Sequence, residues 1–345
     1  MARSTIFDVA KVAGVSIKTV SRVVNREPNV RASTRERVED AIAVLKYKPD
    51  QSARNLASQR SHLIGLVYDD PAAYDMPSGG YILDLQQGAL KACKSALSEL
   101  LIHPCDFRKK DAGRKLKTFI EETRLSGVIL AAPLSNMPRL VRAIEATGTP
   151  MVRLSPGNGS TKELSVSTND REVCAELTRY LAGLGHKRIA FISGDPDHEA
   201  VANRLLGYKD GLAESGLEFS EDLVVDGDNS FGAGLGAALK LLSKENPPTA
   251  IFAANDDMAA GVIRAANRLG VEIPAQLSVA GFDDIALARQ VDPALTTIRQ
   301  PLVRMAKRAA KMLAKGNGES RFKGPQVIPA KIKIRESTGP APRQK

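Results

Sequence analysis

The stretch TIFDVAKVAGVSIKTVSRVVN, residues 5–25, decides how this chain begins to fold. Its first half carries apolar residues at helical spacing, namely Ile6, Val9, Ala10 and Ala13. Thr5 stands where an N-cap side chain accepts from the first turn of a helix. Gly14 interrupts the pattern, and glycine adopts positive φ at little steric cost. The stretch therefore predicts two crossing helices joined by a glycine turn.

Two helices are expected after this turn, the second of the crossing pair and a third one. The first covers residues 17–24, with Ser16 as its N-cap, and its inward face is Val20 with Val23 or Val24. Its outward face carries side chains that suit base edges and phosphates in a major groove: Ile17, Lys18, Ser21 and Arg22. The next helix is expected to open with the capping box Ser33-x-x-Glu36 and to bury Val38, Ile42 and Leu45. This layout predicts a helix-turn-helix.

Positive charge is concentrated at the two ends of the chain. Residues 1–60 contain twelve Lys and Arg against six Asp and Glu, and residues 321–345 contain seven against one. The formal net charge of the whole chain is +10, so the middle is close to neutral. A basic head is typical of phosphate contacts with DNA, although a solvated surface explains the charge by itself equally well.

Several classes of protein are disfavoured by what the sequence lacks. No stretch approaches eighteen uninterrupted apolar residues, and the first residues have no secretory signal pattern. Three cysteines without a C-x-x-C pair indicate reduced thiols in the cytoplasm. The four histidines have no metal-ligand spacing, so neither a metal nor a cofactor is expected.

From residue 61 onward, short apolar runs alternate with helical stretches. The runs lie at 63–67, 127–130, 150–152, 188–192, 223–225, 250–253 and 277–280. This rhythm predicts two doubly wound parallel α/β sheets, one in each of two lobes. In such sheets ligands bind beyond the carboxyl ends of the strands.

Polar and aromatic side chains follow these strand ends. They suit a polyhydroxylated ligand, because hydroxyls need donors and acceptors while the C–H face of a sugar stacks on a ring. The candidates near the strand ends are Asp69, Tyr74, His198, Arg204, Phe231, Asn255 and Asp283. Arg153 ends another strand with a cation, which favours an acidic or phosphorylated sugar or else pairs with a neighbouring aspartate.

The head motif resembles the LacI/GalR family of repressors. The resemblance is carried by Thr5–Ser16, by Thr19–Asn25, by Thr34–Val38 and by Leu45–Pro49. It continues in LGHKRIA at 184–190, NRxxG at 203–207, GFDD at 281–284 and LTTIxQ at 295–300. The resemblance covers essentially the whole chain and implies a homodimeric transcriptional regulator that binds pseudo-palindromic operator DNA and a sugar-type effector.

The resemblance also implies roles for individual residues. DNA contacts are expected from Thr5, Ser16, Ile17, Lys18, Thr19, Ser21, Arg22, Asn25, Asn29, Val30, Tyr47, Ala53 and Leu56. Leu56 would insert between two stacked base pairs from a short hinge helix. By composition alone, the hinge segment is equally consistent with a flexible linker. In the body, Arg204 would grip the effector, Phe231 would stack on it, and Asn255, Asp283 and Gln300 would face it.

These expectations define a domain organisation. Residues 1–48 form the helix-turn-helix headpiece, which is all-α, and 49–60 form the hinge. Residues 61–338 form a periplasmic-binding-protein-like effector-binding and dimerisation body. Its first lobe covers about 61–163 and 298–325, and its second lobe covers about 164–297 and 326–338. Residues 339–345 are expected to be a disordered tail.

Two other functions compete with the regulator. A sugar-binding protein would use the same body without DNA, and an α/β enzyme would need a nucleophile–base pair or a metal set, neither of which is legible. The run Gly232-x-Gly234-x-Gly236 has the wrong spacing for a dinucleotide fingerprint and predicts close helix packing instead.

Overall fold

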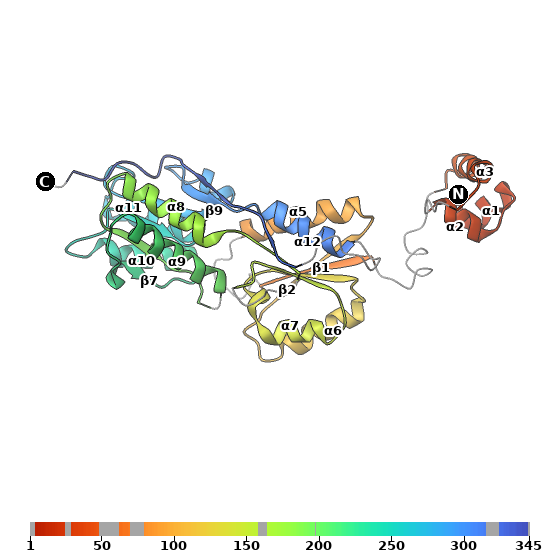
Figure 1. The fold of residues 1–345 in the computed structure, drawn as a ribbon, viewed down its shortest axis with the longest axis horizontal. Coiled ribbons are helices and arrows are strands. Elements are labelled where there is room, and N and C mark those ends of the chain that lie inside the picture. The colour runs from red at the N-terminus through yellow and green to blue at the C-terminus, as the bar shows by residue number, and fades with distance from the viewer. Residues whose placement is uncertain are drawn as a thin grey trace. The chain divides into compact units, whose positions relative to one another are not determined.

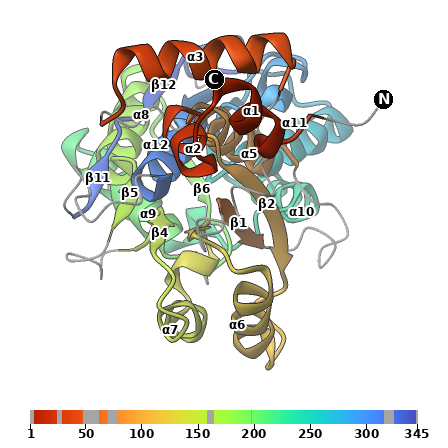
Figure 2. The ribbon, with the colours of Figure 1, turned by 90° about the vertical axis from the view of Figure 1, so that its right-hand side faces the viewer.

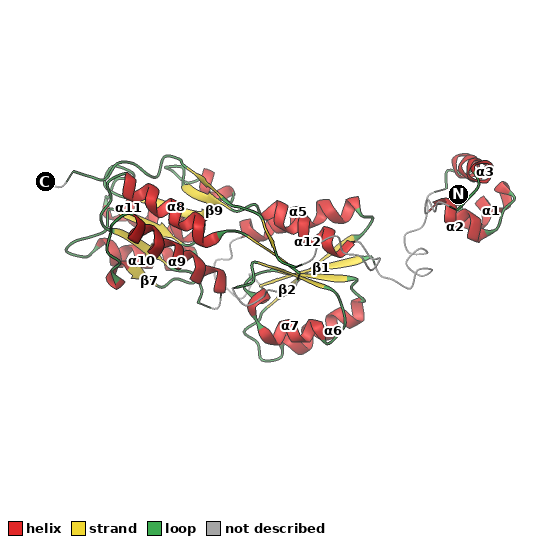
Figure 3. Ribbon diagram, in the orientation of Figure 1, coloured by secondary structure: helices red, strands yellow, loops and turns green. Residues whose placement is uncertain are grey.

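In a computed structural model, the chain forms two compact units, residues 1–61 and 62–345. The structure describes residues 4–24, 29–47, 62–69, 79–157, 164–196, 198–314 and 324–343. Colouring by secondary structure separates an all-helical first unit from a second unit in which strands and helices alternate (Figures 1 and 3).

The first unit has its own small core and matches the predicted helices closely. It consists of α1 (Ile6–Ala13), α2 (Ile17–Val24) and α3 (Ala32–Val44). Thr5 caps α1 reciprocally with Asp8, and Gly14 ends the helix with a φ of 62°. Val9, Val20 and Val38 are fully buried where the three helices meet. The expected helix–glycine turn–helix is therefore confirmed.

The expected capping box of the third helix is wrong. The N-cap of α3 is Arg31, and no side chain caps this helix end. The carbonyl of Arg31 already accepts from the backbone N–H groups of Thr34 and Arg35. Because the helix starts two residues earlier than the motif requires, Ser33 lies inside the first turn and cannot cap it.

The first lobe of the second unit is a six-stranded sheet in the order β11-β5-β4-β3-β1-β2. The strands are β1 (Leu63–Asp69), β2 (Glu99–Cys105), β3 (Gly127–Leu130), β4 (Met151–Leu154), β5 (Ser165–Ser167) and β11 (Gln326–Val327). The helices are α5 (Gly79–Ser95), α6 (Ala112–Thr123), η2 (Leu134–Asn136), α7 (Pro138–Glu145) and α12 (Leu302–Ala314). Figure 2 shows α6 and α7 on one face of this sheet and α5 and α12 on the other.

The second lobe repeats this plan in the order β12-β10-β9-β8-β6-β7. The strands are β6 (Ile189–Ile192), β7 (Val224–Val225), β8 (Ala250–Ala253), β9 (Ser278–Asp283), β10 (Thr296–Arg299) and β12 (Lys331–Lys333). The helices are α8 (Asp170–Gly183), α9 (Glu199–Glu214), η3 (Glu221–Leu223), α10 (Phe231–Leu242), α11 (Asp256–Leu269) and η4 (Ala286–Arg289). All pairings are parallel except the edge strand β12, which runs antiparallel to β10.

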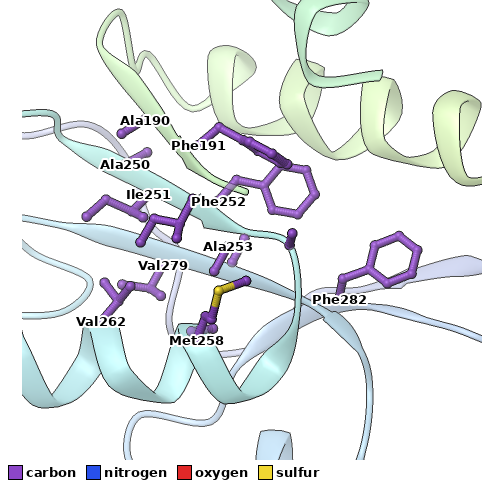
Figure 4. Packing of buried hydrophobic residues seen from close by; sticks show 14 of the residues in the cluster. Ala190, Phe191, Ala250, Ile251, Phe252, Ala253, Met258, Val262, Val279 and Phe282 are labelled. Carbon is purple, nitrogen blue, oxygen red and sulfur yellow. The ribbon is translucent and has the colours of Figure 1, made fainter. Parts of the chain in front are cut away.

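Aromatic and sulfur-containing side chains fill the core of the second lobe. Phe191 and Phe252 meet edge to face at 5.3 Å between ring centroids, and Met258 reaches toward the same strands from α11 (Figure 4). Continuous apolar strands buried on both faces are typical of parallel sheets covered by helices, as the sequence rhythm predicted.

The lobe boundaries differ from the expected ones by a few residues. β5 and β11 belong to the first sheet, although residues 164–297 and 326–338 were assigned to the second lobe. β10 belongs to the second sheet through Arg299, beyond the boundary predicted at residue 298. Each segment near a crossing belongs to the sheet whose strand it pairs with. The hydrophobic pattern of the sequence does not show which strand that is.

The expected disordered tail is also wrong over its first residues. The Gly339 N–H donates to Ser278 Oγ at 3.0 Å, and the Ala341 N–H donates to the carbonyl of Leu184 at 2.8 Å. The carbonyl of Gly339 contacts His186 Nε2 at 3.1 Å. These backbone hydrogen bonds attach the segment to the second lobe despite its Pro-rich composition.

Two other findings concern the chemistry of the chain as a whole. Cys93, Cys105 and Cys174 are all free and buried, as the odd count suggested. Among the described residues, no helix combines the length and apolar character needed to cross a membrane.

The glycine run in α10 contains one position that requires glycine. A Cβ on Gly234 would lie 2.2 Å from the carbonyl oxygen of Met258, whereas a Cβ on Gly236 would meet nothing within 4 Å. The close approach of α10 to α11 therefore depends on Gly234 and not on Gly236.

We expect Gly234→Ala and Gly236→Ala to have opposite effects on stability. Gly234→Ala should lower the free energy of unfolding by on the order of 1–3 kcal/mol, because α10 and α11 must move apart. Gly236→Ala should raise it by about 0.5–1 kcal/mol, because alanine loses less backbone entropy in a helix. Urea unfolding of the two variants checks this, and equal effects would contradict the packing argument.

Candidate functional site

The exposed face of α2 carries the predicted DNA-reading residues. Ile17, Lys18 and Arg22 are exposed and Ser21 is half-buried, while Val20 and Val23 point into the core. Ile17 leaves 41% of its surface exposed. An apolar side chain flanked by cations suits a base edge between phosphates.

Several other predicted DNA contacts have structural roles in the headpiece. Ser16 Oγ accepts from the Thr19 N–H at 3.2 Å and so caps α2, and it lies 2.9 Å from Thr19 Oγ1, so the Thr19 hydroxyl bonds to the capping side chain. Thr5 caps α1. Val30 and Tyr47 are half-buried against the core, whereas Asn29 is exposed.

Four of the predicted contacts cannot be placed. Asn25, Ala53, Leu56 and Tyr74 lie outside the described residues. The hinge helix over residues 49–60 and the wedging role of Leu56 accordingly stay predictions.

In the second unit, Arg204 on α9 is the centre of the predicted effector group. Its Nε donates to Asp170 Oδ2 at 3.2 Å, and its Nη1 donates to the carbonyl of Ala254 at 2.6 Å. The guanidinium carbon lies 3.7 Å from the centroid of the Phe282 ring. Burial lowers the pKa of Arg204, but the carboxylates of Asp170 and Asp283 outweigh this and hold the pKa above its ordinary value. The side chain is thus a buried, fixed cation.

Asp283 and Gln300 form a pair beside this cation. Asp283 ends β9 with a φ of 119°, and Gln300 follows β10. Gln300 Nε2 donates to Asp283 Oδ1 at 2.6 Å, and both residues are buried. Burial raises the pKa of the Asp283 carboxyl to about 7, although Arg204 and Gln300 favour its charged form. A non-glycine residue in this backbone region is strained, and such strain concentrates at functional sites.

Asn255 and Phe231 lie at the N-terminal ends of neighbouring helices. Asn255 caps α11 through Oδ1, which accepts from the Met258 N–H at 2.9 Å, and its Nδ2 donates to the carbonyl of Asn229 at 2.8 Å. Both ends of the amide are thus engaged within the protein. Phe231 is half-buried at the first position of α10.

The buried polar atoms without a hydrogen-bond partner in the described structure include Ser135 Oγ and Asn136 Nδ2 on the first lobe and His198 Nε2 on the second. Burial lowers the pKa of His198 to about 3, and the positive charge of Arg204 adds to this shift, so the ring is neutral. Gly157, which follows β4 of the first lobe, contacts residues of both lobes here. Its N–H donates to Asn136 Oδ1 at 2.8 Å, and its Cα faces Glu199, the neighbour of His198.

The remaining predicted residues of the first lobe are engaged in ion pairs or backbone contacts. Asp69 and Asp195, which lie on different lobes, are both 3.3 Å from the Arg108 guanidinium. Arg153 Nε donates to the carbonyl of Ser135 at 2.7 Å. Arg108 therefore bridges the lobes, and Arg153 positions the loop that carries Ser135 and Asn136.

Sequence reasoning missed part of the site. Asp170 and Phe282 hold Arg204, and Tyr81 of α5 is half-buried close enough to Asp283 and Arg204 for their charges to act on its hydroxyl. Burial raises the pKa of Tyr81 far above its ordinary value, and Asp283 adds to the shift. Tyr81 stands near a strand end in the sequence, which was a usable signal; Ser135, Asn136 and Asp170 carried none beyond their polarity.

The arrangement combines an all-helical unit with an exposed recognition face and a two-lobed body with polar groups at its strand ends. It defines a class of protein, the DNA-binding regulators that respond to a small molecule. A family model described as bacterial regulatory proteins, lacI family, matches residues 5–50. A model described as a periplasmic binding protein-like domain matches residues 178–338.

Individual relatives agree over nearly the whole chain. Catabolite control protein A of Priestia megaterium is 33% identical over 97% of this chain and 99% of its own length. The lac repressor dimer bound to operator and the anti-inducer ONPF shares 27% identity at a TM-score of 0.77. The match covers 98% of this chain and 100% of the repressor chain. The transcriptional regulator in the CelR–cellobiose complex shares 27% identity at a TM-score of 0.73. The match covers 97% of this chain and 100% of that chain. The chain belongs to the LacI family and is a transcriptional regulator.

The raised pKa of Asp283 predicts a defined pH dependence of stability. Between about pH 4 and 7 the folded protein holds a proton on Asp283 that the unfolded chain releases, so stability falls as pH rises through this window. The free energy of unfolding of the wild type, minus that of Asp283→Asn, should fall by up to about 1.4 kcal/mol per pH unit. Denaturant unfolding at several pH values measures it, and a flat or rising difference would refute the assignment.

Proposed function

We propose that this regulator is a cytoplasmic homodimeric repressor of carbohydrate-use genes, controlled by a sugar-type effector between the lobes of its body. The unsatisfied atoms of Ser135, Asn136 and His198 carry this proposal. A buried donor or acceptor without a partner costs about 1–3 kcal/mol, which a hydroxylated ligand would recover. The neutral ring and the amide and hydroxyl groups supply both donors and acceptors for hydroxyls. The effector is bound and released unchanged.

The fixed groups on the second lobe suit the same ligand. Arg204 and the Asp283–Gln300 pair are held by bonds inside the lobe, so they would meet a ligand already oriented. Arg153 donates to a backbone carbonyl. This bond supports a positioning role within the first lobe, which differs from both roles suggested by the sequence, contact with an acidic sugar and pairing with an aspartate.

The effector acts through the angle between the lobes. Both lobes contribute to the group of unsatisfied atoms, and Arg108 already links Asp69 to Asp195 across the junction. A ligand shifts the equilibrium between two lobe arrangements only as far as it binds one of them more tightly than the other. In the dimer this angle would set the separation of the two hinge segments and thereby operator affinity.

The effector site is tested by Ser135→Ala. This change removes an unsatisfied hydroxyl, so the free energy of unfolding should stay the same or rise by about 1 kcal/mol, while stabilisation by the sugar is lost. The measurement is thermal unfolding of the full chain against a panel of neutral, acidic and phosphorylated sugars.

Ser126→Ala is the matched control. Ser126 Oγ donates to the carbonyl of Leu63 at 2.8 Å, so its loss should cost about 0.5–1.5 kcal/mol without changing the sugar response. If Ser135→Ala responded to the same sugar as strongly as the wild type, the proposed site would be wrong.

DNA recognition by α2 is tested with two neighbouring substitutions. Ile17→Ala should weaken binding to the operator by about 1–3 kcal/mol without changing the slope of log K against log salt, because no charge is removed. Lys18→Ala should weaken binding and reduce the slope by about one. Binding to DNA from the region upstream of the protein's own gene, titrated with salt, measures both.

Arg37→Ala provides the comparison, because Arg37 is an exposed cation on α3 outside the α2 face. It should leave the preference for operator over unrelated DNA intact. Equal losses on operator and unrelated DNA for Ile17→Ala would show that α2 does not read bases.

A further inference from the structure

A second polar cavity lies where the lobes join, with a volume of about 500 Å³. Both lobes form its wall: the start of α12 and Asp84 of α5 from the first, and η4, β10 and β12 from the second. Its charged lining residues are Asp84, Asp284, Arg289, Arg299, Arg304, Lys331 and Lys333. None of the predicted effector residues except Gln300 contributes to it.

The charges of this cavity are not balanced. Five cations face two carboxylates, and one of these, Asp284, is fully buried and paired with Arg289, Arg299 and Arg335. Arg304, Lys331 and Lys333 have no carboxylate within 4.0 Å in the parts of the chain that the structure describes. The cavity therefore keeps a strong excess of positive charge after its internal ion pairs are counted.

The strand register adds to this excess. Arg299 of β10 lies directly opposite Lys331 of the antiparallel strand β12. Like charges directly opposite each other destabilise a strand pair. Asp284 already pairs with Arg299, so within the described residues Lys331 is the cation of this pair that an anion in the cavity would neutralise.

The backbone supplies a further attraction for an anion. Leu302, Val303 and Arg304 are the first three residues of α12 and all line the cavity. Their N–H groups have no intrahelical acceptor, and the helix dipole places partial positive charge there. No acidic residue occupies this first turn.

We infer that this cavity binds a small multivalent oxyanion, of the size and charge of a phosphate monoester, as a regulatory ligand separate from the sugar effector. The anion contacts the start of α12 on the first lobe and Lys331 on the second. It therefore favours lobe arrangements in which these groups are close. Because allosteric coupling is reciprocal, the anion and the sugar effector change each other's affinity by the same factor.

The inference is tested with inorganic phosphate as the probe and the full chain at constant ionic strength in chloride. Isothermal calorimetry of the wild type should show saturable binding, with a matching rise in unfolding temperature. The double variant Arg304→Ala/Lys331→Ala should bind phosphate at least tenfold more weakly. Both side chains are exposed, so the variant is expected to fold.

Lys307→Ala/Lys311→Ala is the matched control, because it removes two exposed cations from the same helix outside the cavity. It should bind phosphate like the wild type. Equal weakening in both double variants would mean diffuse attraction by surface charge and would overturn the inference. So would the absence of saturable binding by the wild type, or loss of binding only in Arg139→Ala/Arg142→Ala, which alters a different arginine-lined cavity.

Discussion

The burial of one guanidinium, that of Arg204, organises the second lobe. A charge removed from water costs several kcal/mol unless it is paired and hydrogen-bonded. Here Asp170, the carbonyl of Ala254 and the Phe282 ring meet that need, and they come from the start of α8, the end of β8 and the end of β9. These strand and helix ends are therefore held in one relative position. Asp283 ends β9 and the cap of α11 follows β8, while Gln300 joins Asp283 from the end of the neighbouring strand β10. The polar end of the lobe therefore forms as a unit.

The junction between the lobes contains two regions of contrasting electrostatics. Around His198 and Asp283 burial opposes charge, leaving a neutral imidazole and a carboxyl with a pKa near neutrality. Around Lys331 and Arg304 cations accumulate that have no carboxylate partner within the described part of the chain. A hydroxylated ligand suits the first region and an anion suits the second. Since both regions include groups from each lobe, ligands at either can bias the same motion, which connects two chemical signals to one conformational equilibrium.

The headpiece obtains its stability independently of this junction. Its core is confined to a few small apolar residues centred on Val9, Val20 and Val38, and a core of this size is marginal. Caps at Thr5 and Ser16 and the glycine turn therefore matter more here than in the body. The same hydroxyls that were expected to touch DNA are used to start helices. Ile17, Lys18 and Arg22, the residues predicted to read bases, are exposed on α2.

The sequence by itself determined the features that depend on local periodicity and turn chemistry. Helical spacing and Gly14 predicted α1 and α2, and uninterrupted apolar runs predicted the central strands of both sheets. It missed β2, an edge strand whose alternating exposure weakens the apolar signal, and it misplaced the strands that cross between the lobes. Only the tertiary structure decided which distant groups meet. Asp170 pairs with Arg204 across 34 residues, and β10 and β12 bring Arg299 opposite Lys331. Such pairings arise from sheet register and helix packing, which are set by contacts between elements and have no trace in the spacing of residues along the chain.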